Sequence, residues 1–225
     1  MSALMTLEEG DACEGSIEKL QEFRQLGIRM MTFTWNYPNR LGFPGEPAAS
    51  HLSQSRGLTP LGREFLSEME RLGIIPDVSH LSDAGIRDVC KLAKKPICAS
   101  HSNARSLCHR GRNLPDSLIR SIAEKGGVIG ANYYGPFLSH TPNVLGCYYS
   151  YVSDIVLHIR HIANIGGIDC IGLGSDFDGI DNNLELKNCG CMDLLEQELK
   201  KAGFHEGEID KIFYQNVLAF YKEML

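Results

Sequence analysis

The sequence predicts an α/β fold, namely a (β/α)8 TIM barrel in which about six of the eight strands are present. Short apolar runs alternate with longer amphipathic stretches along the whole chain. This alternation is typical of a parallel sheet with crossover helices. In addition, nearly every apolar run ends in a residue that can bind a metal ion or transfer a proton. Barrel enzymes place their chemistry at these carboxyl ends of the strands.

The pattern of apolar residues predicts each element in turn. Strands are expected at residues 3–7, 29–34, 74–79, 96–100, 127–133 and 170–175. Helices are expected at about 16–26, 59–72, 82–92, 115–125 and 150–165, with two more near 192–202 and 206–223. Ser82 can cap the helix that follows it, and Gly27, Gly73 and Gly203 stand where helices should end. Residues 41–57 are rich in Pro, Gly and Ser, which predicts a long loop at the wall of an active site.

The first predicted strand reads as a buried strand that opens the chain. Six βα units and two more would make the eight that close the commonest parallel barrel, so we expect two strands upstream in the intact protein. Residues 1–225 would then form a single partial barrel domain. An open doubly wound sheet is the alternative, but no Gly-x-Gly-x-x-Gly turn follows the first predicted strand.

Composition limits the partners and the cell compartment. The net charge is -6 and the basic residues are scattered, so we expect neither nucleic acid nor an anionic membrane surface as a partner. No apolar run is long enough for a membrane span, and the first residues do not resemble an export signal. The eight cysteines are spread over a chain that can build a core without disulfides, which favours a cytoplasmic protein.

Two predicted strands end in Ser-His, at His80 and His101. A lone histidine in such a place is more often a structural hydrogen-bonding residue. Two of them on nearby strands, with the carboxylate of Glu8 from a third, favour a metal site, because imidazole and carboxylate are ligands of catalytic zinc. Glu8 could bridge two ions. It could instead complement a helix dipole, a role that is also open to Glu9.

Two acids follow the last predicted strand. Asp176 and Asp178 could point to the same side, because alternate side chains of a strand share a face. Asp176 is the better candidate for a base that acts on a metal-bound water or for a residue that binds a substrate amine. Asp178 fits an Asp-Gly turn better.

Three arginines follow His101, namely Arg105, Arg110 and Arg112. Clustered arginines usually lie in solvent. One arginine beside a metal site could, however, bind the carboxylate of a substrate, because the guanidinium group matches a carboxylate in a bidentate pair. The residues alone do not say which of the three would do so.

Together these motifs resemble the membrane (renal) dipeptidase family of zinc metallopeptidases, which have an amidohydrolase-like barrel, over essentially all 225 residues. The resemblance lies in five segments: Leu7-Glu8-Glu9-Gly10, Asp77-Val78-Ser79-His80-Leu81-Ser82, Ala99-Ser100-His101-Ser102-Asn103, Arg112-Asn113-Leu114 and Gly174-Ser175-Asp176-Phe177-Asp178-Gly179.

The resemblance implies a zinc-dependent dipeptidase, with possible D-residues at the second position and a possible homodimer. By resemblance, Glu8 would bridge two zinc ions, and His80 and His101 would bind the second ion. Arg112 would hold the free carboxylate of the dipeptide. Asp176 would activate the water and pass its proton to the leaving amine.

The chain departs from the family pattern at two points. It has no His-x-Asp motif, which in the family supplies the other ligands of the first ion. Trp35 stands where the animal enzymes have a histidine that contacts the substrate carbonyl, a task that Asn36 or the metal alone could take. Two alternatives therefore stay open: a related amidohydrolase that acts on cyclic or acylated amides, and a non-catalytic truncated remnant.

Overall fold

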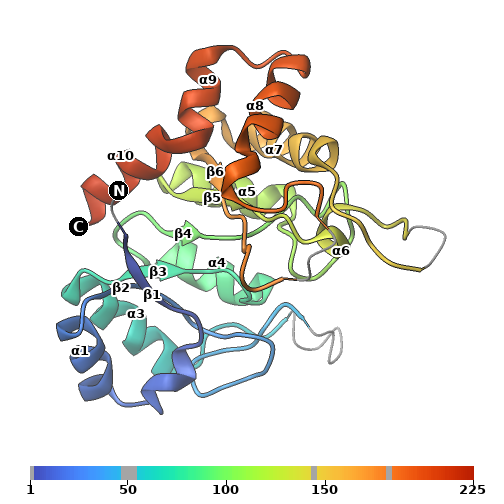
Figure 1. Cartoon of the computed structure of the whole chain (residues 1–225). Helices are drawn as coiled ribbons and strands as arrows, with labels where there is room; N and C mark the ends of the chain where they lie inside the picture. Colours follow the sequence, from blue (N-terminus) through green and yellow to red (C-terminus); the bar gives the residue numbers. More distant parts are fainter. Residues whose placement is uncertain (1–2, 47–54, 143–145, 181–183) are drawn as a thin grey trace.

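The computed structural model describes residues 3–46, 55–142, 146–180 and 184–225. All six predicted strands form, and they lie in one parallel sheet in the order of the sequence (Figure 1). The strands are shorter than expected, because hydrogen bonding stops before the apolar runs end. They are β1 (Met5–Leu7), β2 (Ile28–Thr32), β3 (Ile75–Asp77), β4 (Cys98–Ala99), β5 (Val128–Ala131) and β6 (Ile171–Leu173).

Helices follow each strand, as the alternating pattern predicts. They are α1 (Ile17–Gln25), α3 (Pro60–Leu72), α4 (Asp83–Leu92), α5 (Asp116–Glu124), α6 (Gly135–Leu138), α7 (Val152–Gly166), α8 (Met192–Lys201), α9 (Glu206–Asp210) and α10 (Asn216–Met224). Short 3-10 helices lie at Gly10–Cys13, Ile168–Cys170 and Cys189–Cys191. The last predicted helix is interrupted by one π-helical turn, Lys211–Gln215, between α9 and α10.

The predicted helix ends are confirmed by local geometry. The Ser82 hydroxyl accepts a hydrogen bond from the backbone N–H of Gly85, as an N-cap residue does. Gly73 ends α3 with a φ of 67°, a left-handed conformation that glycine adopts without steric cost. Gly27 and Gly203 also have positive φ angles just beyond α1 and α8. Of the predicted loop, residues 41–46 and 55–57 form no helix or strand, and residues 47–54 lie outside the described part.

The two faces of the sheet bury different side chains. Met31 of β2 packs with the helices in the main core, together with Leu20 and Phe65. Met30 points the other way, because successive side chains of a strand alternate. It joins a second core with Ile75, Cys98 and Val128 from the next three strands and with Phe220 and Met224 of α10. The C-terminal helix therefore covers part of the inner face of the sheet.

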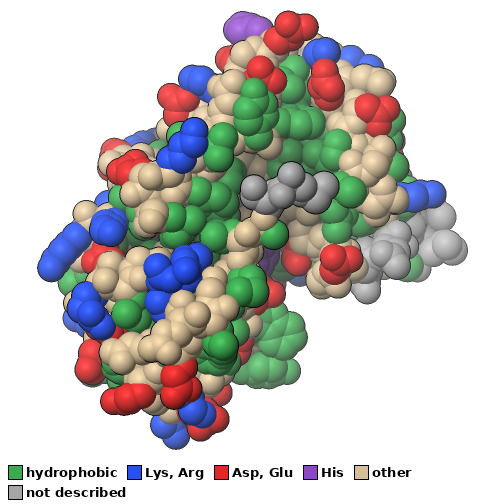
Figure 2. Space-filling view, turned by 60° about the vertical axis from the view of Figure 1, so that its left-hand side comes forward, with side chains coloured by type: hydrophobic (Ala, Val, Ile, Leu, Met, Phe, Trp, Pro, Cys, Tyr) green, Lys and Arg blue, Asp and Glu red, His purple; other side chains and the backbone are tan. Residues whose placement is uncertain are grey.

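The sheet is open, because β1 and β6 each have a neighbouring strand on one side among the described residues. The expectation that the first strand is buried is wrong: Met5 is 54 % exposed, since no described strand covers the outer edge of β1. Hydrophobic side chains reach the surface between the N-terminal third and the C-terminal helices (Figure 2). None of the described helices has the length and hydropathy to cross a bilayer.

Candidate metal centre

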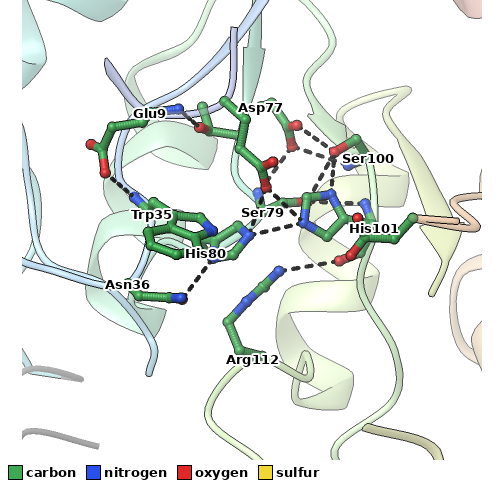
Figure 3. Close-up of polar contacts among 12 residues, drawn as sticks. Glu9, Trp35, Asn36, Asp77, Ser79, His80, Ser100, His101 and Arg112 are labelled. Carbon is green, nitrogen blue, oxygen red and sulfur yellow. Dashed lines mark hydrogen bonds and ion pairs between the residues drawn. The ribbon is translucent and has the colours of Figure 1, made fainter. Parts of the chain in front are cut away.

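The carboxyl ends of three strands bring Glu8, His80 and His101 together. Glu8 Oε1 lies 2.9 Å from His80 Nε2 and 3.3 Å from His101 Nε2. The two Nε2 atoms are 3.0 Å apart (Figure 3). Within the described residues, this is the one group of three or more ligand-type side chains found close enough to hold a metal ion.

The chemistry of these three residues fits a divalent cation. The close approach of His101, and then of His80, holds the pKa of Glu8 well below its ordinary value, so the side chain is a carboxylate. Burial, and then the positive charge of Arg112, lower the pKa of His80 to about 3, so its ring is neutral. Ligands of one zinc ion, bonded at about 2.0–2.1 Å, lie about 3 Å from one another. The observed spacing therefore suits one ion bound by all three.

The backbone at the site is held in an uncommon conformation. His80 and Asp176 have φ angles of 69° and 59°, in the left-handed region that few residues other than glycine adopt. The carbonyl of His80 accepts a hydrogen bond from Gly45 N–H, and Ser82 N–H donates to the carbonyl of Phe43. The loop after β2 thus holds the turn that carries His80. Such strained residues often cluster at functional sites.

Glu9 does not join the metal group. Its carboxylate accepts hydrogen bonds from Trp35 N–H at 3.1 Å and from Asn39 Nδ2 at 2.7 Å. Glu9 therefore anchors the loop that carries Trp35 and Asn36 (Figure 3). Asn36 Oδ1 lies 3.3 Å from His80 Nδ1, on the side of the ring that faces away from Glu8. Trp35 is 43 % exposed and lies at the mouth of the site.

The structure distinguishes the three arginines by their partners. Arg105 forms a double contact with Asp83, with two N···O distances of 2.7 Å. Arg110 donates to the carbonyl of Pro136. Arg112 is 5 % exposed, and its Nε has no hydrogen-bond partner among the described residues. Burial lowers the pKa of Arg112 to about 10, so it remains a cation at neutral pH.

Asp176 is half-buried beside the same group. Its Oδ2 accepts a hydrogen bond of 3.1 Å from Asn132 Nδ2, and burial raises its pKa above the ordinary value. The expectation that Asp176 and Asp178 share a strand face is wrong, because β6 ends at Leu173 and both residues lie beyond it. Asp178 is exposed in a turn that Gly179 N–H closes by donating to the carbonyl of Asp176.

Two adjoining cavities open at this edge of the sheet. A cavity of about 440 Å³ is lined by Glu8, Trp35, Asn36, His80, Arg112 and Asp176, among others. A second, of about 190 Å³, reaches from Glu8, His101 and Asp176 towards the inner face of the strands. The structure thus brings every predicted site residue to one mouth. Their functional roles remain predictions.

Sequence reasoning missed the residues behind this group. Asp77, at the end of β3, is 2 % exposed and contacts Ser100, the residue before His101. Asn132, directly after the end of β5, contacts Asp176. A signal for Asp77 was present, because a carboxylate in an apolar strand must find buried hydrogen-bond donors.

The open parallel sheet, with a carboxylate and two histidines at its carboxyl ends, defines a metal-dependent hydrolase of the TIM-barrel type. Within that class, the chain belongs to the membrane dipeptidase family (peptidase family M19), which it matches over residues 1–224. The solved relatives described below are metallopeptidases, so the family to which this chain belongs is one of metal-dependent enzymes.

Known relatives agree with this assignment. The chain is 33% identical over 231 residues to an uncharacterized protein in the pqqA 5' region of Klebsiella pneumoniae, covering 97% of this chain and 80% of that protein. A metallopeptidase of Rhodobacter sphaeroides, crystallised with a phosphinate mimic of the dipeptide L-Ala-D-Ala, superimposes with a TM-score of 0.88 at 29% identity. The match covers 99% of this chain and 63% of that one.

Two further solved structures are similar. A metallopeptidase called dipeptidase AC has a TM-score of 0.88 at 29% identity, with 98% of this chain and 65% of that one covered. An amidohydrolase from Pseudomonas aeruginosa has a TM-score of 0.81 at 27% identity, with 96% and 71% covered. This chain therefore spans about two thirds of the length of these solved relatives.

Proposed function

We propose that the chain forms part of a zinc-dependent dipeptidase that hydrolyses the peptide bond of dipeptides, including those with a D-residue in second position. One observation carries this proposal: the group of Glu8, His80 and His101 shares its cavity edge with the buried, incompletely paired guanidinium group of Arg112. A cation that lies beside a metal site suits a substrate with a free carboxylate. The dipeptide mimic bound to the Rhodobacter sphaeroides relative supports this substrate class.

The proposed roles follow from the contacts of each residue. Arg112 would bind the free C-terminal carboxylate, which restricts the substrate to two residues. Asn36 lines the same cavity and would contact the substrate beside His80. Asp176 would take a proton from the attacking water and return it to the leaving amine. Burial raises its pKa, which makes it a stronger base than an ordinary aspartate and suits a group that must accept a proton and then release it.

Glu8, His80 and His101 would hold the metal, and we propose zinc on account of the nitrogen and oxygen donors. When bound, zinc polarises a carbonyl and lowers the pKa of water towards neutrality. We further propose that Glu8 bridges to a second ion. Among the described residues no second group of three or more ligand-type side chains is found, and we propose that the other ligands of that ion come from outside this part of the chain.

Metal content and hydrolysis together test the proposal. The chain would be loaded with zinc, and its metal would be counted by mass spectrometry beside His80→Ala and His101→Ala. We expect bound zinc to be lost in both variants and kept in His205→Ala, which alters an exposed histidine elsewhere. Hydrolysis of L-Ala-D-Ala and L-Ala-L-Ala would be followed by chromatography. Zinc binding that survives both site substitutions would contradict the assignment.

A second candidate is an amidohydrolase that acts on cyclic or acylated amides, which the likeness to the Pseudomonas aeruginosa amidohydrolase favours. N-acetyl amino acids have the same free carboxylate as dipeptides but no free amine. Faster turnover of N-acetyl-alanine than of dialanine would support this candidate over a dipeptidase. Zinc binding without turnover of any amide would instead indicate a non-catalytic remnant.

We also propose a cytoplasmic location and a possible homodimer. The four buried cysteines, Cys13, Cys98, Cys108 and Cys170, are free thiols, which suits a reducing compartment. Thiol titration of the denatured protein, purified without reductant, should find all eight thiols of the sequence. Fewer thiols would contradict the proposed location. Light scattering during gel filtration would measure the mass and decide between monomer and dimer.

A further inference from the structure

A hydrogen-bonded chain lies behind His101, on the side of the ring that faces away from Glu8. His101 Nδ1 is 2.8 Å from Ser100 Oγ, and Ser100 Oγ is 2.5 Å from Asp77 Oδ2 (Figure 3). The other oxygen, Asp77 Oδ1, accepts hydrogen bonds of 3.0 Å from the backbone N–H groups of Ser79 and Ser100. The carboxylate is therefore fixed between β3 and β4.

The number of protons available to Asp77, Ser100 and His101 determines which atom donates in each of these hydrogen bonds. A carboxylate only accepts hydrogen bonds, so the single hydroxyl proton of Ser100 points to Asp77. Ser100 Oγ can then only accept from His101, which places the ring proton on Nδ1. Glu8 Oε1 is the competing acceptor on the other side of the ring, but it lies 3.3 Å from Nε2, whereas Ser100 Oγ lies 2.8 Å from Nδ1. Nε2 is therefore left with its lone pair, which faces Glu8 and His80.

The surroundings hold this arrangement in place. Asp77 is 2 % and His101 is 8 % exposed, so water cannot easily replace either partner. Ser79 Oγ accepts a 3.0 Å hydrogen bond from the backbone N–H of His101 and lies 3.3 Å from Ser100 Oγ. Ser79 thus fixes the backbone of His101, and Ser100 fixes its ring.

We propose that Asp77, acting through Ser100, is a positioning residue that keeps His101 in the Nδ1–H tautomer and so presents Nε2 to the metal. The use of that nitrogen for metal binding rests on the proposed function, whereas the tautomer itself does not. Partners in this position orient a ligating histidine, and their loss commonly weakens metal binding about 10–100-fold.

Asp77→Asn should reverse the direction of the hydrogen bonds that connect residue 77, Ser100 and His101, while the side chains keep their positions. The amide oxygen must take the place of Oδ1, because two backbone N–H groups point there. The amide NH₂ then faces Ser100 Oγ and donates to it. The hydroxyl proton of Ser100 is released to its nearest remaining acceptor, His101 Nδ1. The ring proton would move to Nε2 and block the metal ligand.

Nitrogen-15 NMR of the metal-free wild-type protein provides the first test, because the two neutral tautomers give different ¹⁵N shifts and couplings. His101→Gln identifies the signal. We expect Nδ1–H in the wild type and Nε2–H in Asp77→Asn. A wild-type His101 protonated on Nε2 overturns the proposal, and this measurement needs no variant at Asp77. It also stands apart from the proposed function, because no metal is present.

Cobalt titration, followed by the visible absorption of bound Co²⁺, provides the second test. We expect Asp77→Asn and Ser100→Ala each to bind Co²⁺ about 10–100-fold more weakly. Asp116→Asn is the matched control, since Asp116 also contacts a serine and a histidine, Ser106 and His161, but lies outside the metal group.

Circular dichroism would confirm that each variant is folded before its titration is interpreted. Wild-type affinity in a folded Asp77→Asn overturns the proposal, and so does an equal loss in Asp116→Asn. Failure of the wild type to bind Co²⁺ would contradict the proposed function and leave the NMR test to decide on the tautomer.

Discussion

At the scale of single residues, Arg112 differs from Arg105 and Arg110 because its guanidinium group is buried and its Nε has no hydrogen-bond partner in the described part of the chain. Arg112→Lys keeps the charge but loses the planar fork that matches a carboxylate. If Arg112 binds the free carboxylate, the value of kcat/KM for a dipeptide should fall about 10–100-fold, the equivalent of about 1.5–3 kcal/mol for a hydrogen bond to a charged group. Steady-state kinetics on L-Ala-D-Ala would measure this loss.

The matched substrate for this test is the amide of the same dipeptide, which lacks the carboxylate. The substitution should change its kcat/KM much less. An equal loss for the acid and the amide would mean that Arg112 supports the fold of the site and does not select the carboxylate.

The residues in contact with the proposed metal were predictable from the sequence, whereas those behind them were not. Glu8, His80 and His101 stand at strand ends, and parallel strands end at one edge of the sheet. The pairing of Asp77 with Ser100 depends on the register between β3 and β4, which no local pattern records. Likewise, three nearby arginines look alike until tertiary contacts give Arg105 a carboxylate partner.

At the scale of elements, close approach between strands depends on glycine. A Cβ atom at Gly174 would lie 2.1 Å from the carbonyl oxygen of Ser100 and 3.0 Å from the backbone of Gly130. Gly174→Ala should therefore push the end of β6 away from β4 and β5. We expect the free energy of unfolding to fall by about 1–3 kcal/mol, the usual effect of overpacking. Urea denaturation would measure the change.

Gly207 of α9 is the matched control, because a Cβ atom there would meet nothing within 4 Å. Gly207→Ala should stabilise the protein by up to about 1 kcal/mol, since alanine favours the helix. If Gly174→Ala lowered the free energy of unfolding no more than Gly207→Ala does, the backbone around Gly174 would have room for a methyl group. This would contradict the close approach to Ser100 and Gly130.

Helix α7 contains a buried histidine that should make stability depend on pH. His158 is 1 % exposed; its Nδ1 accepts a hydrogen bond from Ala104 N–H, and its Nε2 donates to the carbonyl of Leu138. Burial lowers its pKa from 6.5 to about 4. Between these two values the unfolded chain binds a proton that the folded chain does not. Lower pH therefore favours unfolding through this residue, by about 3 kcal/mol in total.

Urea denaturation at a series of pH values would measure this effect. Acidic residues also contribute to acid unfolding, so His158→Asn is compared with the wild type at each pH. The difference in unfolding free energy between the two should shrink as the pH falls from 6.5 to 4. A constant difference across this range would show that His158 is not held neutral in the folded protein.

At the scale of the whole molecule, the parallel arrangement was predictable and the exposure of its edges was not. Alternating apolar and amphipathic stretches define six βα units, and all six pair in sequence order. Burial of β1, however, depends on whether another strand covers its outer edge, and the apolar composition of the strand does not report this. The same holds for α10, whose packing on the inner side of the sheet through Phe220 and Met224 follows from the tertiary fold.

The open edge of β1 should make the chain associate with itself. Unpaired backbone groups on an apolar edge strand favour pairing with another chain, and a lysine on such a strand opposes it. Met5 is 54 % exposed on β1, so Met5→Lys should reduce association. Because the side chain lies largely in solvent, its replacement should change the free energy of unfolding by no more than about 0.5 kcal/mol.

Light scattering over a concentration series would show the average mass rising more steeply for the wild type than for Met5→Lys. Leu26→Lys is the control for charge and hydrophobicity, because Leu26 is 70 % exposed but follows α1 and has no free strand edge. Equal effects of the two lysines would mean that general surface hydrophobicity, and not the strand edge, drives association. A wild type of constant mass would mean that the edge is protected in solution, and a covering for β1 would then have to be identified.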